Sequence, residues 1–229
     1  MKVKTLQISN IWIFKYVEDI TDAVKIIFDE NFNILIGQNG AGKSTTLEVI
    51  NFIFKRVLFV PYHKNQELYG RRITVKADEK KNILSRINGI KDYGSFRLEK
   101  NYDFEEKSQK IRIVITLDDI DHANIQLLQD NKAKLIPLIG TYSVAQMFGD
   151  GTYQNEYQVD IELDSVTKNY TVTSSNQDIG FTYLTEYNLY KEIIDMYNEE
   201  NSESPITNLA ESFALIGSYR NYNVYATAV

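Results

Sequence analysis

One segment constrains the fold of this 229-residue chain more than any other: Gly37-Gln38-Asn39-Gly40-Ala41-Gly42-Lys43-Ser44. It matches the P-loop pattern of spaced glycines followed by a lysine and a hydroxyl residue. Glycines allow the backbone to curl into a nest of inward N–H groups, and a helix that begins near Lys43 adds its positive N-terminal end. The segment therefore predicts a site for a nucleoside triphosphate.

The expected ligands of this loop are ATP and Mg²⁺. Lys43 is expected to reach the β- and γ-phosphates, and the Ser44 hydroxyl is expected to bind Mg²⁺. The predicted nucleotide-binding set is Gly37, Gln38, Asn39, Gly40, Ala41, Gly42, Lys43, Ser44 and Thr45. The competing interpretation is a glycine-rich turn without a ligand. We disfavour it because the loop joins a predicted buried strand, 32–36, to a predicted helix, 43–60.

The hydrophobic pattern predicts both strands and helices. Further strands are expected at 2–8, 23–28, 96–104 and 110–117, with a hairpin formed by 156–163 and 168–174. Helices are expected at 124–139 and 183–200, and a loop at 145–153. The chain is thus expected to be an α/β protein.

Composition excludes several classes of site. The chain has no cysteine, which excludes disulfides and zinc-thiolate centres. Its two histidines, His63 and His122, are too few and too far apart to predict a metal site. Neither a signal peptide nor an apolar run of bilayer length is present, so we expect a cytoplasmic protein without membrane association.

The loop Gln38-Asn39-Gly40-Ala41-Gly42-Lys43-Ser44-Thr45 closely resembles that of ABC-type ATPases. The early strands and the lead-in Asn33-Ile34-Leu35-Ile36-Gly37 resemble the SMC/RecF/OLD branch, which places the P-loop near the N-terminus. The following Thr46-Leu47-Glu48-Val49-Ile50-Asn51-Phe52 is also typical of that branch. The resemblance covers residues 1–60 and resumes at 213–221, where an ordinary strand that ends at Gly217 is an equal alternative.

The resemblance implies an α/β P-loop NTPase: an ABC-ATPase-type lobe with an antiparallel β-subdomain and a mixed central sheet. Residues 1–229 are expected to form the N-terminal lobe, with a basic insertion at about 61–95 and the C-terminal lobe outside this chain. The implied activity is ATP hydrolysis, completed by the second lobe and by a homodimer or higher oligomer that sandwiches ATP. The implied roles are DNA repair, chromosome handling or anti-phage defence.

The sequence departs from this family pattern in four motifs: the signature segment, the Walker B strand, the basic contact after the first strand and the Q-loop. It has no signature segment, and its only Walker B candidate is Asp118, for which we favour an ordinary strand followed by a polar turn. Where relatives carry a basic residue that approaches the nucleotide, this chain has Trp12, and the basic contact is either missing or moved to Lys15. Trp12 is a candidate to stack on adenine, although we favour a core position for it. No glutamine stands out as the Q-loop residue among Gln126, Gln129, Gln146, Gln154, Gln158 and Gln177.

A basic segment stands out in an otherwise acidic chain. Ten basic and only three acidic residues lie between Lys55 and Lys91, although the net charge of the whole chain is -6. A DNA contact around Arg71, Arg72, Lys80 and Lys81 is one interpretation, and a solvated surface insertion is the other.

Two other function classes stay open. One is a nucleotide-gated scaffold that recruits an effector protein, such as a nuclease or a toxin. The other is the nucleotide-binding subunit of an ABC transporter, which the missing signature segment disfavours.

Overall fold

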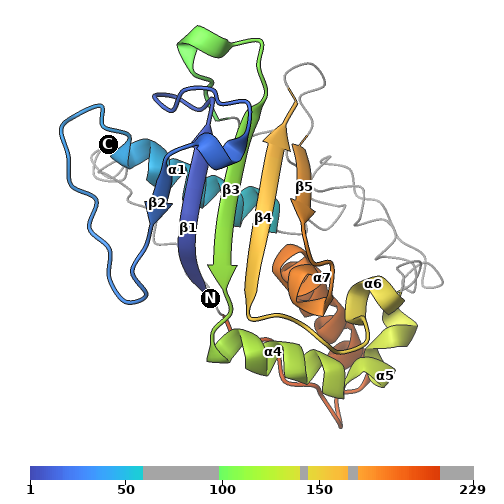
Figure 1. Cartoon of the computed structure of the whole chain (residues 1–229). Coiled ribbons are helices and arrows are strands. Elements are labelled where there is room, and N and C mark those ends of the chain that lie inside the picture. Colours follow the sequence, from blue (N-terminus) through green and yellow to red (C-terminus); the bar gives the residue numbers. More distant parts are fainter. Residues whose placement is uncertain (59–97, 140–143, 165–169, 212–229) are drawn as a thin grey trace, which may run out of the picture.

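Five antiparallel strands form the framework of the chain in the computed structural model, which describes residues 1–58, 98–139, 144–164 and 170–211 (Figure 1). Their order is β2-β1-β3-β4-β5, and each neighbouring pair runs antiparallel. The predicted α/β class is therefore confirmed, and so is the predicted antiparallel pairing of strands. The predicted mixed sheet is wrong for the described residues, because none of their strands pair in parallel.

Alternation of apolar and polar residues accounts for the central strands β1 (Lys2–Ser9), β3 (Gln109–Thr116) and β4 (Glu156–Leu163). In β3 three buried isoleucines alternate with half-buried side chains such as Lys110 and Arg112. Successive side chains of a strand point to opposite faces, so in β3 and β4 one face joins the core, whereas the second half of β1 is buried on both faces. The strands predicted at 2–8 and 110–117 are confirmed.

The outer strands of the sheet are shorter. Strand β5 (Tyr170–Ser174) pairs with β4 and confirms the predicted hairpin. Strand β2 (Lys25–Ile27) pairs with β1 and occupies only the middle of the predicted strand 23–28.

The strand predicted at residues 32–36 is wrong. This segment carries no strand and pairs with none of the described strands. Phe32, Ile34 and Ile36 are 74%, 66% and 88% exposed, whereas the prediction placed them in the core. A β-prone sequence needs a neighbouring strand and a packed face to become a buried strand, and the described residues supply neither here.

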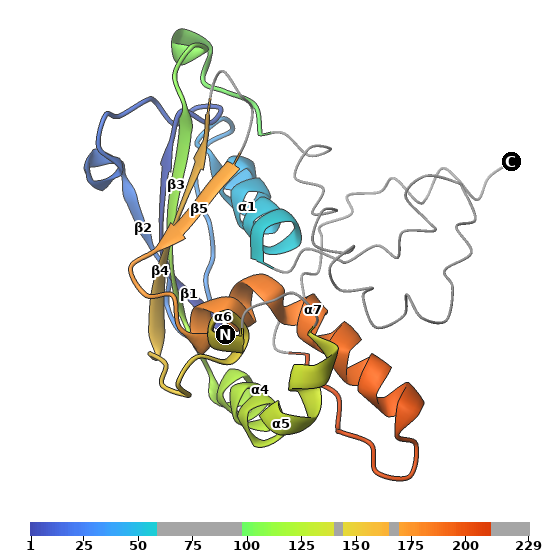
Figure 2. The ribbon, with the colours of Figure 1, turned by 90° about the vertical axis from the view of Figure 1, so that its right-hand side faces the viewer.

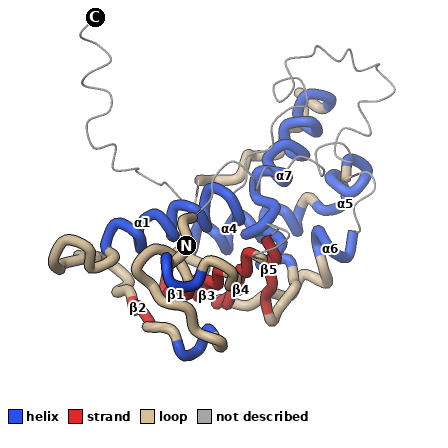
Figure 3. Tube along the Cα trace, turned by 90° about the horizontal axis from the view of Figure 1, so that it is seen from above, coloured by secondary structure: helices blue, strands red, loops and turns tan. Residues whose placement is uncertain are grey.

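Helix α1 (Lys43–Phe52) continues as the π-helical segment η2 (Ile53–Leu58), so the helix predicted from Lys43 is confirmed as far as the description extends. It covers one face of the sheet (Figure 2). Seen from above, α1 lies on the same side of the strand row as α4 (Asp119–Asp130) and α7 (Ile179–Glu200) (Figure 3). Buried side chains of α1 and η2 join those of the strands and α7 in one core.

The remaining helices gather at one end of the sheet (Figure 1). Helix α7 begins four residues before its predicted start, because the Asp178 carboxylate accepts a hydrogen bond from the Phe181 amide and caps it there. The predicted helix 124–139 is instead α4, which begins at Asp119, followed by α5 (Lys132–Leu135) and a short 3-10 turn. None of the described helices is long and apolar enough to cross a bilayer.

Two short segments differ from their predicted conformation. Residues 98–104, predicted as part of a strand, contain the 3-10 turn η4 (Tyr102–Phe104), which follows Asn101 as its cap. Residues 145–153, predicted as a loop, include most of helix α6 (Val144–Phe148). In η4 the cap at Asn101 is a local contact that overrides a weak hydrophobic pattern.

Candidate functional site

The glycine loop leads directly into helix α1, as the motif requires. Gly40 and Gly42 have φ values of 84° and 86°, in the left-handed region that a side chain disfavours. Gly42 is the N-cap residue, and its carbonyl accepts the first helical hydrogen bond from the Thr46 amide at 2.8 Å. The Thr46 hydroxyl donates to the same carbonyl at 2.9 Å and fixes the end of the helix.

The amides of the loop fit a polyphosphate. Within the described residues, the N–H groups of Gly40, Gly42, Lys43, Ser44 and Thr45 donate no hydrogen bond, and α1 has no side-chain cap. Unsatisfied N–H groups at a helix N-terminus, together with the helix dipole, form an anion site. Residues 37–41 are exposed, so an anion has access to them.

Lys43 supplies the positive charge of the loop. Its Nζ donates to the carbonyls of Gly37 and Gln38, at 2.7 Å each. These two bonds hold the ammonium group against the loop, and its third N–H remains available for a phosphate oxygen. The role predicted for this lysine, contact with the β- and γ-phosphates, stays a prediction.

Ser44 and Thr45 differ in what they offer. Ser44 is exposed, and its hydroxyl has no partner among the described residues, so it fits the predicted role of Mg²⁺ ligand. Thr45 is only 9% exposed, which leaves its amide rather than its side chain as the group that faces a nucleotide.

A turn from the end of β1 packs against this loop. A Cβ atom on Gly42 would meet Ile13 Cδ1 at 2.7 Å and Phe14 Cζ at 3.2 Å. The residue between Ile11 and Ile13 is Trp12, which is 47% exposed, so the predicted core position of Trp12 is wrong. Sequence reasoning missed this contact between the turn and the loop, because two segments some 30 residues apart meet only through the tertiary fold.

The family of the chain follows from comparison with known proteins. Residues 1–228 match the family model of the AAA ATPase domain. The chain belongs to this family. Membership supports ATP binding and ATPase activity, and it agrees with the loop geometry. No curated protein and no solved structure matches the chain.

In this AAA ATPase domain, Asp118 acts as a helix cap. Its Oδ1 accepts hydrogen bonds from the amides of Ile120 and Asp121, at 3.0 and 3.2 Å, and its other oxygen pairs with the amine of Met1. Burial opposes ionisation of the Asp118 carboxyl, but the hydrogen bonds from the amine and from Asp121 outweigh it and lower its pKa.

The sheet register also separates Asp118 from the glycine loop. Strands β1 and β3 are antiparallel, with Ser9 opposite Lys110. The turn that contacts Gly42 follows Ser9, whereas Asp118 follows Thr116 at the other end of β3. At about 3.4 Å per residue the two ends are roughly 20–25 Å apart. The geometry favours the polar-turn interpretation of Asp118 over the Walker B one.

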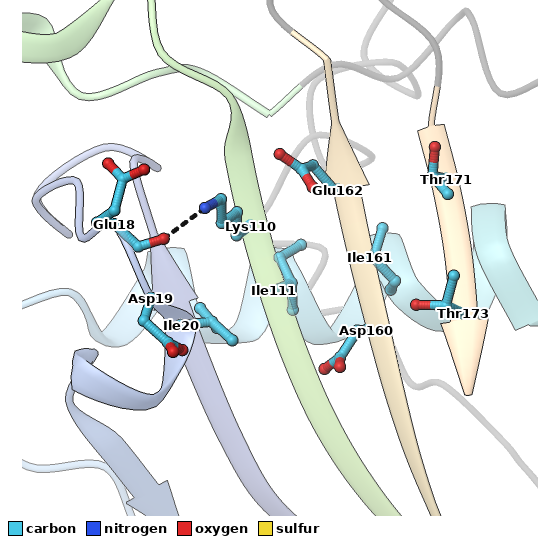
Figure 4. A pocket seen from close by; sticks show the side chains of 10 residues that line it. All are labelled: Glu18, Asp19, Ile20, Lys110, Ile111, Asp160, Ile161, Glu162, Thr171 and Thr173. Carbon is cyan, nitrogen blue, oxygen red and sulfur yellow. Dashed lines mark hydrogen bonds between the residues drawn. The ribbon is translucent and has the colours of Figure 1, made fainter. Parts of the chain in front are cut away.

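An open hollow of about 490 Å³ lies on the sheet face opposite α1 (Figure 4). Four of its side chains are acidic: Glu18, Asp19, Asp160 and Glu162. The Lys110 ammonium, which also lines it, donates to the Glu18 carbonyl at 2.6 Å. A polyphosphate would be repelled here, so this hollow is not the nucleotide site.

Other predicted features lie elsewhere. His122 bonds to Tyr153 and Asn155, and the described part contains no group of three acidic or histidine side chains that could hold a metal ion. Lys15 is exposed on the turn beside the loop. The basic insertion at about 61–95, with Arg71, Arg72, Lys80 and Lys81, and the segment 213–221 are outside the described residues.

Proposed function

We propose that this AAA ATPase domain binds ATP with Mg²⁺ through residues 37–45 and serves as an ATP-switched subunit of an SMC/RecF/OLD-like machine. One observation carries the nucleotide site: left-handed Gly40 and Gly42, five unpaired amides and the Lys43 ammonium gather at the start of α1. When bound, Mg²⁺ neutralises phosphate charge and orients the triphosphate.

Each group of the loop has a distinct task in this proposal. The five unpaired amides of the loop and of the start of α1 hold the phosphate oxygens without moving, because the glycine backbone and the Thr46 bonds to Gly42 already fix their direction. Lys43 donates its third N–H to a phosphate oxygen and brings a full positive charge. The Ser44 hydroxyl takes the cation.

The test measures ATP affinity and turnover of Lys43→Ala. Removing a charged donor is expected to weaken ATP binding by about 100-fold or more. Lys25→Ala is the matched control, since Lys25 is an exposed lysine on β2 whose side chain makes no hydrogen bond or ion pair within the described part. Unchanged ATP affinity in Lys43→Ala would refute the site.

Exposed apolar residues beside the loop support the second-lobe part of the proposal. Phe32, Ile34 and Ile36 lead into Gly37 with most of their surface in contact with solvent. Burying such side chains is favourable, so a segment with this pattern suits a packing partner. In the proposal that partner is the second lobe, and a homodimer then encloses the nucleotide.

DNA association is the further part of this proposal, and the charge of the segment between Lys55 and Lys91 supports it. Reversing Arg71 and Arg72 to Glu is expected to weaken DNA binding and to flatten the slope of log affinity against log salt by up to about 2. DNA-stimulated ATP turnover would support the machine. ATP binding without turnover in the presence of DNA would favour the nucleotide-gated scaffold instead.

A further inference from the structure

The segment 32–36 runs beside the sheet with its backbone unpaired. Phe28, which precedes it, donates its amide to the Lys4 carbonyl at 2.9 Å near the start of β1, and Gly42, which follows it, lies against Ile13 past the end of β1. The segment therefore runs in the same direction as β1, from the end of the sheet where the N-terminus lies toward the start of α1 (Figure 1). None of its backbone N–H or C=O groups makes a hydrogen bond within the described residues. The segment thus lacks the neighbour that would make it a strand.

The composition of the segment indicates which kind of neighbour it lacks. The strands β3 and β4 alternate apolar and polar residues, as antiparallel strands with one solvated face do. Strands of a parallel pair are usually covered on both faces and read as nearly continuous apolar runs. Phe32, Ile34, Leu35 and Ile36 form such a run, yet Phe32, Ile34 and Ile36 are at least 66% exposed. This composition fits a parallel neighbour.

A second apolar run, Phe213-Ala214-Leu215-Ile216-Gly217, begins three residues after Ala210. The contacts of Ala210 decide where that run starts. The Ala210 carbonyl accepts a hydrogen bond from Asn124 Nδ2 on α4 at 2.8 Å. On the same helix, the Asp121 carboxylate pairs with the amine of Met1 at 2.8 Å, at the start of β1. The last described residues therefore lie at the end of the sheet from which the segment 32–36 also starts.

We propose that residues 213–217 pair with residues 32–36 as a parallel strand. Three residues span at most about 10 Å, so the run starts close to the anchor at Ala210. Because both segments start at the same end of the sheet, a pair between them is parallel. The ladder satisfies the open backbone groups of residues 32–36 and brings apolar side chains together.

This pairing has a consequence for the nucleotide loop. It holds the residue directly before Gly37, whose carbonyl accepts a hydrogen bond from the Lys43 ammonium at 2.7 Å. Ladder hydrogen bonds use the edge of a strand and leave its side-chain faces free. The faces of residues 32–36 are therefore still available to the second lobe of the proposed function.

The test uses cysteine pairs and a short bis-maleimide, because the chain contains no cysteine and gives no background. Phe32→Cys is combined with Phe213→Cys, and Ile36→Cys with Gly217→Cys. Both pairs are expected to crosslink within one chain, since paired strands lie about 4.8 Å apart. The exchanged combinations, Phe32→Cys with Gly217→Cys and Ile36→Cys with Phe213→Cys, are the matched controls. Their cysteines would be about 13 Å apart along the strands, beyond the reach of the reagent.

The crosslinks are mapped by mass spectrometry without nucleotide, so the result does not depend on the proposed function. Equal crosslinking in all four combinations would overturn the proposal, as would its absence in all four. Preferential crosslinking of the exchanged pairs would overturn it by showing an antiparallel arrangement. Crosslinks between two chains, seen as covalent dimers, would assign the segment to a second copy and overturn it too.

Hydrogen exchange gives an independent readout on the chain without added cysteines. Leu215→Pro removes one backbone donor and disrupts a ladder. It is expected to speed exchange of the protected amides among residues 34–36 by at least about 10-fold and to leave the amides of β3 unchanged. Thr227→Pro, which lies beyond the run, is the matched control and is expected to exchange as the wild type does. Unchanged exchange of residues 34–36 in Leu215→Pro would overturn the proposal.

Discussion

Replacing Gly42 by alanine tests how the loop is built. The new Cβ would meet Ile13 Cδ1 at 2.7 Å and Phe14 Cζ at 3.2 Å, at a residue whose φ is 86°. The positive φ costs about 1–2 kcal/mol for a residue with a side chain. Overpacking adds about 1–3 kcal/mol, toward the lower end here because Ile13 Cδ1 is the mobile end of its side chain.

Gly40→Ala is the matched control. Gly40 has nearly the same φ, 84°, but no atom lies within 4 Å of its added Cβ. Both variants carry the backbone strain and the same change in unfolded-chain entropy of about 0.4–1 kcal/mol, so these contributions cancel between them. The difference isolates the contact between the turn and the loop, and we expect Gly42→Ala to be less stable than Gly40→Ala by about 1–2 kcal/mol.

Urea unfolding followed by circular dichroism measures this difference. A lower midpoint at an unchanged slope reports a loss of stability. Both variants should also bind ATP more weakly than the wild type, because both alter the directions of the loop amides. Equal midpoints for the two variants would refute the packing of Ile13 and Phe14 on Gly42.

Three further variants probe the rest of the fold. Asp118→Ala should lower the unfolding free energy by about 1–2 kcal/mol through loss of the helix cap, with unchanged ATP affinity in Mg²⁺; a large loss of affinity would restore the Walker B interpretation. Because the folded-state pKa of Asp118 is lowered, its stabilisation is present above the ordinary aspartate pKa and is lost as pH falls through the folded value, so wild type and variant should converge in acid unfolding curves. Gly180→Ala would place a Cβ against the Tyr157 hydroxyl and should cost about 1–3 kcal/mol in thermal unfolding, and adding Tyr157→Phe should recover part of it; strictly additive losses would contradict the clash. Asn124→Ala removes bonds to the amide and carbonyl of Ala210, both 2.8 Å, and should cost about 1–3 kcal/mol and speed proteolysis after α7; wild-type protease resistance would argue against this anchor.

The nucleotide loop and the strands and helices with a clear hydrophobic period could be predicted from the sequence, because the interactions that determine them are local. Gly40, Gly42 and Lys43 act through backbone conformation and charge within a few residues. The alternation in β4 and β5 and the polar pair Asp164-Ser165 in the sequence encode a hairpin in the same local way. Helix α7 was predicted except for its first turn, which depends on the cap at Asp178.

Tertiary structure decided the rest. Residues 32–36 have the composition of a buried strand, yet whether they become one depends on a partner strand, and the described residues provide none. Trp12 is of a residue type that is usually buried, but Asn101 and Glu99, nearly 90 positions later in the chain, fix its backbone, and its side chain is left 47% exposed. Such contacts between distant segments produce no periodic pattern in a sequence. The conformation of a glycine loop or an alternating strand, in contrast, is encoded by residues that lie next to one another in the chain.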